Sequence, residues 1–449
     1  MRGLRSTIAL FVVLIGLAAY IYFVTSKAPD STTVAAKERV YPKLDAAGIV
    51  EIVVKADGGD TTTLKKDNGA WQLTAPISSK AEEMEVTQLT SNLSTLEIGR
   101  VVDEKPADLN QYGLQTPRIE IDFKSNGDKD YHRLYLGEKS PTGSDLFARR
   151  DTDARVILVA GYTEMIFNRT TFDLRDKILV RFEHDKVDRI EMSSGGKTLE
   201  LAKSADNTWN ITKPVMLPGD FGSIDGLLGR IQTAAVKSVV SENAEPADVK
   251  KFGLDKPQGT LILSAGGVPQ TLVIGGKVDD NTVYVRDSSK PMVGGIDVSF
   301  LKELQKTADD YRSKDLFAFK AFNADRLELV RDGQSFVFEK VKSKDTTPDK
   351  WHRVSPNPGN PNDANMESLI AKIENLRAAS FVDSAAKTGL DKPTATIIVK
   401  FDDGKKEDRV SFAKTGADVY ASATGQPGAA KVTTTEFDAT LKALDEVSK

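Results

Sequence analysis

The chain has 449 residues, a formal net charge of −4 and 28% charged residues, and it contains no cysteine. This balance gives no broad positive field to hold phosphates, so nucleic acid is not an expected partner. Without cysteine there can be no disulfide, thiolate metal site, cysteine nucleophile or lipid-modified cysteine. A domain usually has about 100 to 200 residues, so the length predicts about three domains.

An apolar, uncharged stretch of 18 residues runs from Thr7 to Val24. As a helix that rises ~1.5 Å per residue it would be about 27 Å long, which is close to the hydrocarbon thickness of a bilayer. Signal peptides usually have a shorter apolar region, of roughly 7 to 15 residues, before a cleavage site with small residues. We therefore expect residues 1–25 to be an uncleaved transmembrane anchor and the membrane to be one partner.

The charges beside this stretch bear on its orientation. Arg2 and Arg5 precede it, and four basic residues between positions 27 and 43 follow it. Because large domains cross membranes largely regardless of charge, we expect the short N-terminal tail to stay inside and the rest to lie outside. Residues 26–44 contain Pro29 and show little apolar periodicity, so they are predicted to form a tether.

The first folded region starts with a predicted β-hairpin. Strand-like runs at 49–55 and 61–66 flank a turn of glycine and aspartate residues. A short strand at 71–74 follows, and apolar residues at helical spacing from Val86 to Leu96 then predict an amphipathic helix. Four runs with a period of two come next, at 118–123, 132–136, 146–149 and 156–159. Their alternation predicts an antiparallel meander, and a second helix is expected after it.

The same order of elements occurs twice more. The segment 188–192 (Asp-Arg-Ile-Glu-Met) matches 325–329 (Asp-Arg-Leu-Glu-Leu) at a spacing of 137 residues. Self-similarity at this long period predicts tandem copies of a small domain rather than the layers of a solenoid. Further helices are predicted at 224–231, 298–307, 366–376 and 435–446.

Two short motifs mark each copy. A tryptophan begins a short strand that ends in proline, and a later Gly-Leu-x-x-Pro motif has its glycines 140 and 136 residues apart. The tryptophans are Trp71, Trp209 and Trp351. The second motif consists of Gly113, Leu114 and Pro117, then Gly253, Leu254 and Pro257, then Gly389, Leu390 and Pro393.

Each motif has a structural and a functional interpretation. An exposed tryptophan can stack on a sugar or a peptide, but a large ring in a strand that faces a helix is more often part of the core. In Gly-Leu-x-x-Pro the glycine permits a positive φ angle, the leucine fills the core and the proline fixes the start of the next strand. The motif lacks the length and the several glycines of a phosphate-binding loop. We predict a structural role for both motifs.

Candidate catalytic and metal-binding residues are few. The three histidines, at 132, 184 and 352, occupy non-equivalent positions in the copies. No zinc-peptidase, serine-hydrolase, P-loop or dinucleotide-binding signature occurs. A loop of asparagine and aspartate at 360–363 offers oxygen ligands but lacks the spacing of a calcium loop. We predict no catalytic site, no metal site and no cofactor.

Together the patterns predict an α+β fold of three tandem repeats, each an antiparallel β meander with one or two packed helices, after a single N-terminal transmembrane helix. The repeats are assigned to residues 45–182, 183–320 and 321–449. An Arg-x-Lys sequence stands at each join between repeats. Pairing with nearby carboxylates is its ordinary role, in preference to binding of an anionic polymer.

An N-terminal span followed by tandem units with these motifs resembles a bacterial family known only as a domain of unknown function. The resemblance rests on the tryptophan segments at 71–76 and 209–214 and on the Gly-Leu-x-x-Pro copies; the third segment, 351–356, departs by having Arg353 before its apolar residue. The family is similar to envelope components found beside, or fused with, auxiliary proteins of gliding-motility-type ABC transporters. This resemblance implies a bacterial envelope protein. With the orientation expected from the charges, we predict an inner-membrane protein with its N-terminus in the cytoplasm and its repeats in the periplasm or outside.

The sequence leaves three functions open. The first is a non-enzymatic, membrane-anchored envelope protein that acts as a scaffold or accessory component of a transporter-associated complex, with ABC transporter components as partners. The second is a protein that binds cell-wall or surface polysaccharide, and the third is an enzyme with an acidic site between repeats. We expect the first, because the repeats carry no catalytic motif.

Overall fold

The computed structural model describes residues 37–59, 61–151, 153–343, 349–382 and 387–448, together with the single positions 15 and 20. By its internal packing the chain divides into two compact units, Met1–Lys177 and Ile178–Lys449. Apart from those two single positions, the predicted transmembrane span lies outside the described residues. Among the residues that are described, no helix is long and apolar enough to cross a membrane.

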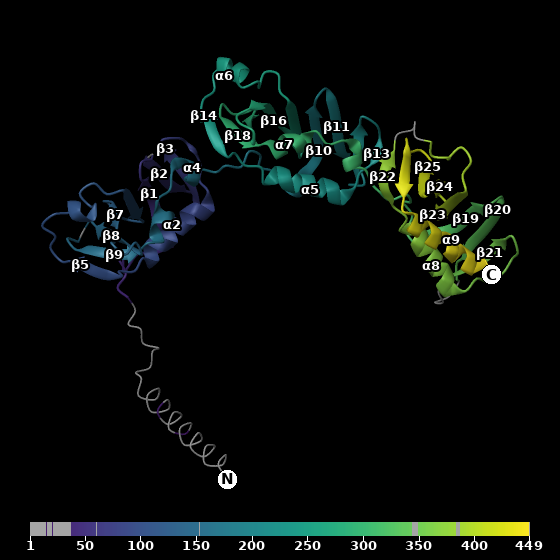
Figure 1. Ribbon diagram of the computed structural model, residues 1–449, viewed down its shortest axis with the longest axis horizontal. Helices are drawn as coiled ribbons and strands as arrows, with labels where there is room; N and C mark the ends of the chain where they lie inside the picture. The colour runs from purple at the N-terminus through teal and green to yellow at the C-terminus, as the bar shows by residue number, and fades with distance from the viewer. Residues whose placement is uncertain are drawn as a thin grey trace, which may run out of the picture. The chain divides into compact units, whose positions relative to one another are not determined.

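The first unit contains a nine-stranded antiparallel sheet with the order β4-β3-β2-β1-β6-β7-β8-β9-β5. Its strands are β1 (Ile49–Lys55), β2 (Thr61–Asp67), β3 (Ala70–Ala75), β4 (Ser79–Lys80), β5 (Arg100–Asp103), β6 (Ile119–Ser125), β7 (His132–Lys139), β8 (Asp145–Arg150) and β9 (Val156–Ala160). Its helices are α2 (Glu83–Thr95), α3 (Thr163–Phe167) and α4 (Thr171–Leu174), with short 3-10 turns η1 (Ala46–Gly48) and η2 (Asn110–Tyr112). Figure 1 shows α2 beside this sheet.

The second unit begins with another nine-stranded sheet, in the order β13-β12-β11-β10-β15-β16-β17-β18-β14. Its strands are β10 (Val187–Ser194), β11 (Lys197–Lys203), β12 (Trp209–Lys213), β13 (Leu217–Pro218), β14 (Ser238–Ser241), β15 (Gly259–Ala265), β16 (Val268–Lys277), β17 (Thr282–Asp287) and β18 (Val293–Asp297). The helices are α5 (Phe221–Gln232), α6 (Pro246–Lys251) and α7 (Val298–Leu304), with 3-10 turns η3 (His184–Lys186) and η4 (Ala308–Asp310).

The same unit contains a third sheet of eight strands, in the order β21-β20-β19-β23-β24-β25-β26-β22. Its strands are β19 (Ala324–Arg331), β20 (Gln334–Val341), β21 (Lys350–Ser355), β22 (Ala378–Val382), β23 (Ala395–Phe401), β24 (Lys406–Thr415), β25 (Asp418–Ala423) and β26 (Ala429–Val432). Its helices are α8 (Asp363–Glu374) and α9 (Thr434–Ser448). The order repeats that of the other sheets without an equivalent of β4 or β13.

Each sheet joins the hairpin before its first helix to the meander after it. β1 pairs with β6, β10 with β15 and β19 with β23, and all three pairs are antiparallel. β5, β14 and β22, which follow the helices, return to the far edge beside the last meander strand. The predicted α+β class, with antiparallel sheets and few helices, is confirmed. The single sheet formed by the two groups of strands was not predicted.

The main core of each repeat lies between the sheet and its helices. In β1, Ile52 and Val54 are fully buried, as the alternation of the strand requires. In α2, Val86, Leu89 and Leu93 are fully buried at the predicted helical spacing. Full burial of one such side chain contributes ~1.5–3 kcal/mol, so this face of α2 holds the helix on the sheet.

The segment that enters each repeat supplies one apolar side chain to its core. Val40, Leu179 and Leu316 are 0%, 2% and 8% exposed. Each donates its backbone N–H to a carbonyl just after α2, α5 or α8, at 2.7, 3.0 and 3.2 Å respectively. Residues 38–40, at the end of the predicted tether, therefore pack as part of the first repeat because Val40 fills this apolar position.

Residues 312–316 connect the second and third sheets within the second unit. Arg312 forms a β-bridge with Gly219, next to β13, and Asp315 forms one with Arg377, next to β22. One short extended segment thus hydrogen-bonds to the edges of two sheets.

Candidate functional site

The tryptophans of the first motif pack in the cores of their sheets. Trp71 and Trp209 are only 5% and 6% exposed. Trp351 is half-buried and packs against the core of the third sheet. A lysine from the neighbouring strand lies over each ring, at 5.9, 5.3 and 5.3 Å from the ring centre. The rings therefore offer no open platform for stacking on a sugar.

The third tryptophan strand differs because of Arg353. Strand pairing places Arg353 opposite Phe338, where the first two sheets have Leu73 and Ile211. Those two side chains are 1% and 0% exposed, whereas the Arg353 side chain turns to the end of α9. Its Nη1 donates to the carbonyl of Ser448 at 2.6 Å, and its Nε donates to the carbonyl of residue 357 at 2.9 Å. An arginine at this position caps the C-terminus of the final helix.

The glycine of Gly-Leu-x-x-Pro requires both its backbone conformation and its small size. The φ angle is 65° at Gly113, 70° at Gly253 and 73° at Gly389, in the left-handed region. A Cβ at Gly113 would lie 2.9 Å from the backbone nitrogen of Glu138, and one at Gly389 would lie 2.8 Å from Oγ1 of Thr415. The turn packs directly on the meander.

The leucine of this motif fills a small second cluster in the second repeat, outside the main core. Leu254, which is 5% exposed, packs with Phe252 and Val293, and the half-buried Tyr284 covers them. Leu114 is similarly buried at 3% exposure, and Leu390 is half-buried. Pro117, Pro257 and Pro393 each stand two residues before a meander strand, β6, β15 or β23. The motif residues support the fold and do not converge on a cavity.

The remaining candidates of the sequence lie apart from one another. His132 is near Asp128 at 3.3 Å and His184 is near Asp225 at 3.4 Å, in different units. In the loop considered for calcium, Asn362 is the N-cap of α8 and accepts a hydrogen bond from its backbone. No group of three or more acidic or histidine side chains in the described parts of the chain is arranged to hold a metal ion.

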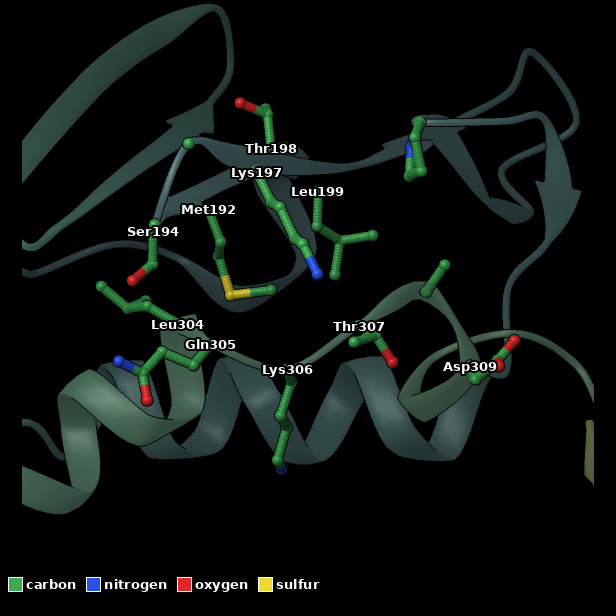
Figure 2. Close-up of a pocket in the computed structure, with 14 residues that line it drawn as sticks. Met192, Ser194, Lys197, Thr198, Leu199, Leu304, Gln305, Lys306, Thr307 and Asp309 are labelled. Carbon is green, nitrogen blue, oxygen red and sulfur yellow. The ribbon is translucent and has the colours of Figure 1, made fainter. Parts of the chain in front are cut away.

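A cavity in the second repeat is the candidate functional site. It has a volume of about 880 Å³ and lies between the β10–β11 hairpin and the segment from the end of α7 to η4. Figure 2 shows these two walls, with the hairpin above and the α7–η4 segment below. Pockets for small molecules commonly measure roughly 300 to 1,000 Å³. The sequence patterns did not predict this cavity.

The floor of the cavity is apolar and its rim is polar. Met192 and Leu199 come from the hairpin and Leu304 from α7, and they are 1%, 5% and 3% exposed. The hairpin turn consists of Gly195 and Gly196, whose φ angles of 58° and 75° suit a two-residue β-turn. The polar side chains on the rim are Ser194, Lys197, Thr198, Gln305, Lys306, Thr307 and Asp309.

A network centred on Glu303 holds the lower wall of the cavity in place. Oε1 of Glu303 accepts hydrogen bonds from Tyr311 at 2.6 Å, from Arg230 of α5 at 2.7 Å and from Lys306 at 2.8 Å. Burial alone would raise the pKa of Glu303, but the hydrogen bonds from Lys306, Tyr311 and Arg230 outweigh it and lower the pKa. The carboxylate is therefore ionised at neutral pH and fixes the α7–η4 segment on α5.

In the first repeat, hydrogen bonds join the two segments that correspond to these cavity walls. The backbone N–H of Asp57, in the hairpin, donates to Oδ1 of Asn168 at 2.9 Å. The hydroxyls of Thr62 and Thr171 share a buried hydrogen bond of 2.7 Å. These contacts tie the β1–β2 hairpin to the α3–α4 segment.

The residues at the equivalent positions of the second repeat are apolar. Leu199 stands two positions before the core leucine of β11, as Thr62 does in β2. Ala308 follows the threonine of a capping box, as Thr171 does in the first repeat. In the third repeat an ion pair of 2.7 Å links Arg331 of the hairpin to Asp445 of α9.

Two segments of the chain, residues 71–209 and 209–393, match the sequence profile described as Domain of unknown function (DUF4340). The chain belongs to this family. In this DUF4340 protein the matched segments meet at Trp209, and each crosses a join between two predicted repeats. The boundaries of the family unit therefore differ from those of the sheets, because the unit begins in the third strand of one sheet and continues into the next sheet.

The search of curated proteins found no match. Similar solved structures include the DNA polymerase III subunit beta from Pseudomonas aeruginosa, with 7% identity over 87% of this chain and 93% of that one. Another is a DnaN sliding clamp from Pseudomonas aeruginosa bound to griselimycin, with 7% identity over 89% and 93%. Both have a TM-score of 0.15, and a likeness at this level carries no argument about fold or function.

Proposed function

We propose that this protein is a non-enzymatic scaffold of the bacterial cell envelope, anchored in the inner membrane by residues 1–25, whose repeats hold components of a transporter-associated complex. The observation that carries the proposal is the join in the second unit. There residues 312–316 bridge to the edges of two sheets, so neighbouring domains are connected by backbone hydrogen bonds as well as by the chain. A connection of this kind suits a protein that presents several surfaces in a fixed order.

The side chain of Arg312 supports this interpretation of the join. Its guanidinium lies 3.7 Å from the ring centre of Phe381, in β22, and donates to Oε1 of Gln426, in the β25–β26 loop, at 3.2 Å. Asp309 is its ion-pair partner at 3.5 Å. Arg312 is only 8% exposed, so its charge interacts within the join and is largely inaccessible to an external anionic polymer.

The partner prediction is tested by co-purification from native membranes. The full chain, tagged at its C-terminus, is crosslinked in cells, solubilised in mild detergent and isolated, with residues 1–44 fused to the same tag as the control. We expect transporter components to be enriched with the full chain and absent with the control. No membrane protein above the control would contradict the scaffold, and recovery of wall polysaccharide instead would favour the second function.

The predicted topology is tested by cysteine labelling, because the chain has no cysteine of its own. A membrane-impermeant maleimide added to intact spheroplasts is expected to label a Lys250→Cys variant, since Lys250 lies on α6 in the repeat region. A Ser6→Cys variant is expected to react only after lysis. The reverse pattern would place the repeats in the cytoplasm and contradict the proposed location.

A further inference from the structure

The cavity of the second repeat combines an apolar floor with one unpaired positive charge. Of the charged residues on its rim, Lys306 shares the Glu303 carboxylate with Arg230, at 2.8 and 2.7 Å, and Asp309 is paired with Arg312 at 3.5 Å. Lys197 lines the same cavity and has no carboxylate partner among the described residues. Lys197 is therefore the rim charge most open to an anionic ligand.

The orientations of the side chains also distinguish Lys197 from Lys306. In Figure 2, Lys197 extends from the hairpin into the space between the walls, whereas Lys306 extends away from it. The sulfur of Met192 lies between the hairpin and the lower wall in the same view. A methionine there adds a flexible, polarisable surface that adapts to apolar ligands of varied shape.

Exposed apolar residues follow the cavity lining in the chain. Pro214 lines the cavity, and the next two residues, Val215 and Met216, are 40% and 64% exposed.

The walls of the cavity are fixed before any ligand arrives. The Glu303 network holds the lower wall on α5, and the upper wall is a closed two-residue hairpin in which Ser193 and Thr198 share a hydrogen bond of 3.0 Å across the strands. A preformed site loses less conformational freedom on binding, so more of the apolar contact appears as affinity.

We propose that this cavity binds one acyl chain of a monoanionic amphiphile, with the chain over Met192 and Leu199 and the anionic group at Lys197. Burial of methylene groups against the floor drives binding, and the lone cation selects a negative group over a neutral one. A free fatty acid and an anionic phospholipid share this chemistry. The inference goes beyond the scaffold function and holds whether or not a transporter is the partner.

The test uses the full chain in membranes and a palmitic acid that carries a diazirine and an alkyne. After irradiation, the labelled peptides are located by mass spectrometry. We expect labelling to concentrate on the peptides that contain Met192 to Leu199 and Leu304 to Asp309, which form the two walls. The same probe as a methyl ester is expected to label them at least about fivefold less, because it lacks the charge that Lys197 attracts.

Four variants separate the parts of the proposal. Lys197→Gln should lower labelling by the acid at least about fivefold without changing labelling by the ester, and Lys197→Arg should restore it. Lys277→Gln removes the same charge from an exposed lysine of this repeat that does not line the cavity, and it should match the wild type. Ala308→Phe fills the cavity and should lower labelling by both probes.

A phosphatidylglycerol with the same photoreactive chain distinguishes the two sources. Labelling by this lipid alone identifies a phospholipid, and labelling by the acid alone identifies a fatty acid; both results support the shared chemistry. Labelling spread evenly over the chain, or equal labelling of the wild type and Lys197→Gln, contradicts the proposal. Each variant counts as folded when hydrogen exchange in its second sheet matches that of the wild type.

Discussion

The first and second repeats have the same sheet order, yet they differ where the first hairpin meets the last helical segment. In the first repeat, Thr62 and Thr171 join the two walls through a buried hydrogen bond. In the second, Leu199 and Ala308 stand at these positions, and a cavity of about 880 Å³ lies between the walls. A hydroxyl pair can close such a gap, because each group satisfies the other, whereas a leucine and an alanine form no such bond. A few side chains therefore determine whether the space between the hairpin and the helical segment is closed or open in the same fold.

The third repeat differs from the other two because it has a charged residue at a position where they have an apolar core side chain. Arg353 stands at the position of Ile211, and its guanidinium reaches the last carbonyls of α9. In the described part of the first two repeats, no helix of this length follows the meander. The arginine is thus matched to α9, and the comparison can be tested by exchanging the residues.

Exchange at this position has the largest expected effect. Ile211→Arg would place an unpartnered charge in the core of the second sheet and should lower its free energy of unfolding by about 4 kcal/mol or more. Arg353→Leu loses hydrogen bonds to the end of α9 but gains apolar contact, and should cost only about 1–2 kcal/mol. Hydrogen exchange, read peptide by peptide, assigns each loss to one sheet. Equal losses would contradict the assigned registers.

Replacing a tryptophan with alanine is expected to destabilise its sheet more when the ring is more deeply buried. Trp209→Ala removes a ring that is 6% exposed and should destabilise the second sheet by about 3–5 kcal/mol. Trp351→Ala should cost the third sheet about 1–2 kcal/mol less, because that ring is half-buried. Hydrogen exchange of β12 and β21 measures both. A larger loss for Trp351→Ala would show that the ring belongs to the core as fully as Trp209.

The Glu303 network predicts that acid loosens the lower wall of the cavity. The pKa of Glu303 is lowered in the folded state, so its carboxylate stabilises the fold above the ordinary pKa of 4.5 and loses this effect as pH falls through the folded-state pKa. Glu303→Gln should cost about 1–3 kcal/mol at pH 7, and the difference from the wild type should shrink in acid.

Urea denaturation followed by Trp209 fluorescence, with the other two tryptophans replaced by phenylalanine, measures this dependence in the second sheet. Asp255→Asn, at an exposed position of the same repeat, is the control and should leave the stability unchanged. A gap between Glu303→Gln and the wild type that stays constant down to pH 3 would contradict the assigned network.

The first repeat should respond to pH with the opposite sign. Burial, with the nearby charge of Glu120, raises the pKa of Asp122 to about 6, against a weaker effect of Arg133. The protonated form stabilises the fold below the ordinary value of 3.8, and this contribution is lost as pH rises through about 6.

Replacement of Asp122 by asparagine should therefore stabilise the first sheet at pH 8 by about 1 kcal/mol, after allowing for the lost pairing with Arg133. Urea denaturation followed by Trp71 fluorescence, at pH 5 and pH 8, checks the sign. A variant that is less stable than the wild type at pH 8 would show that the ion pair with Arg133 outweighs the cost of burial.

Much of this fold could be predicted from the sequence because its signals are local. The spacing of Val86, Leu89 and Leu93 predicted the buried face of α2, and the alternation in β1 predicted its core side. The repeated motifs predicted three similar α+β units. The domain boundaries remain predictions. The anchor and the topology also remain predictions, because the span lies almost entirely outside the described residues.

The cavity could not be predicted because it depends on contacts between distant segments. Its walls come from residues near 195 and near 306, and neither Leu199 nor Ala308 is unusual in its own element. A position-by-position comparison with Thr62 and Thr171 is the signal that could have found it. Arg353 did stand out in the sequence, but its role became clear only from its contacts with the end of α9.

The reactivity of a single cysteine at Ala308 and at Thr171 tests the central contrast most directly. Ala308 is half-buried at the open cavity, whereas Thr171 is 7% exposed beneath the hydrogen-bonded hairpin. In the cysteine-free full chain, Ala308→Cys should react with a small maleimide in the native state, and Thr171→Cys should react only when the first sheet unfolds. Equal rates for the two variants, or protection of both, would contradict the contrast between an open second repeat and a closed first repeat.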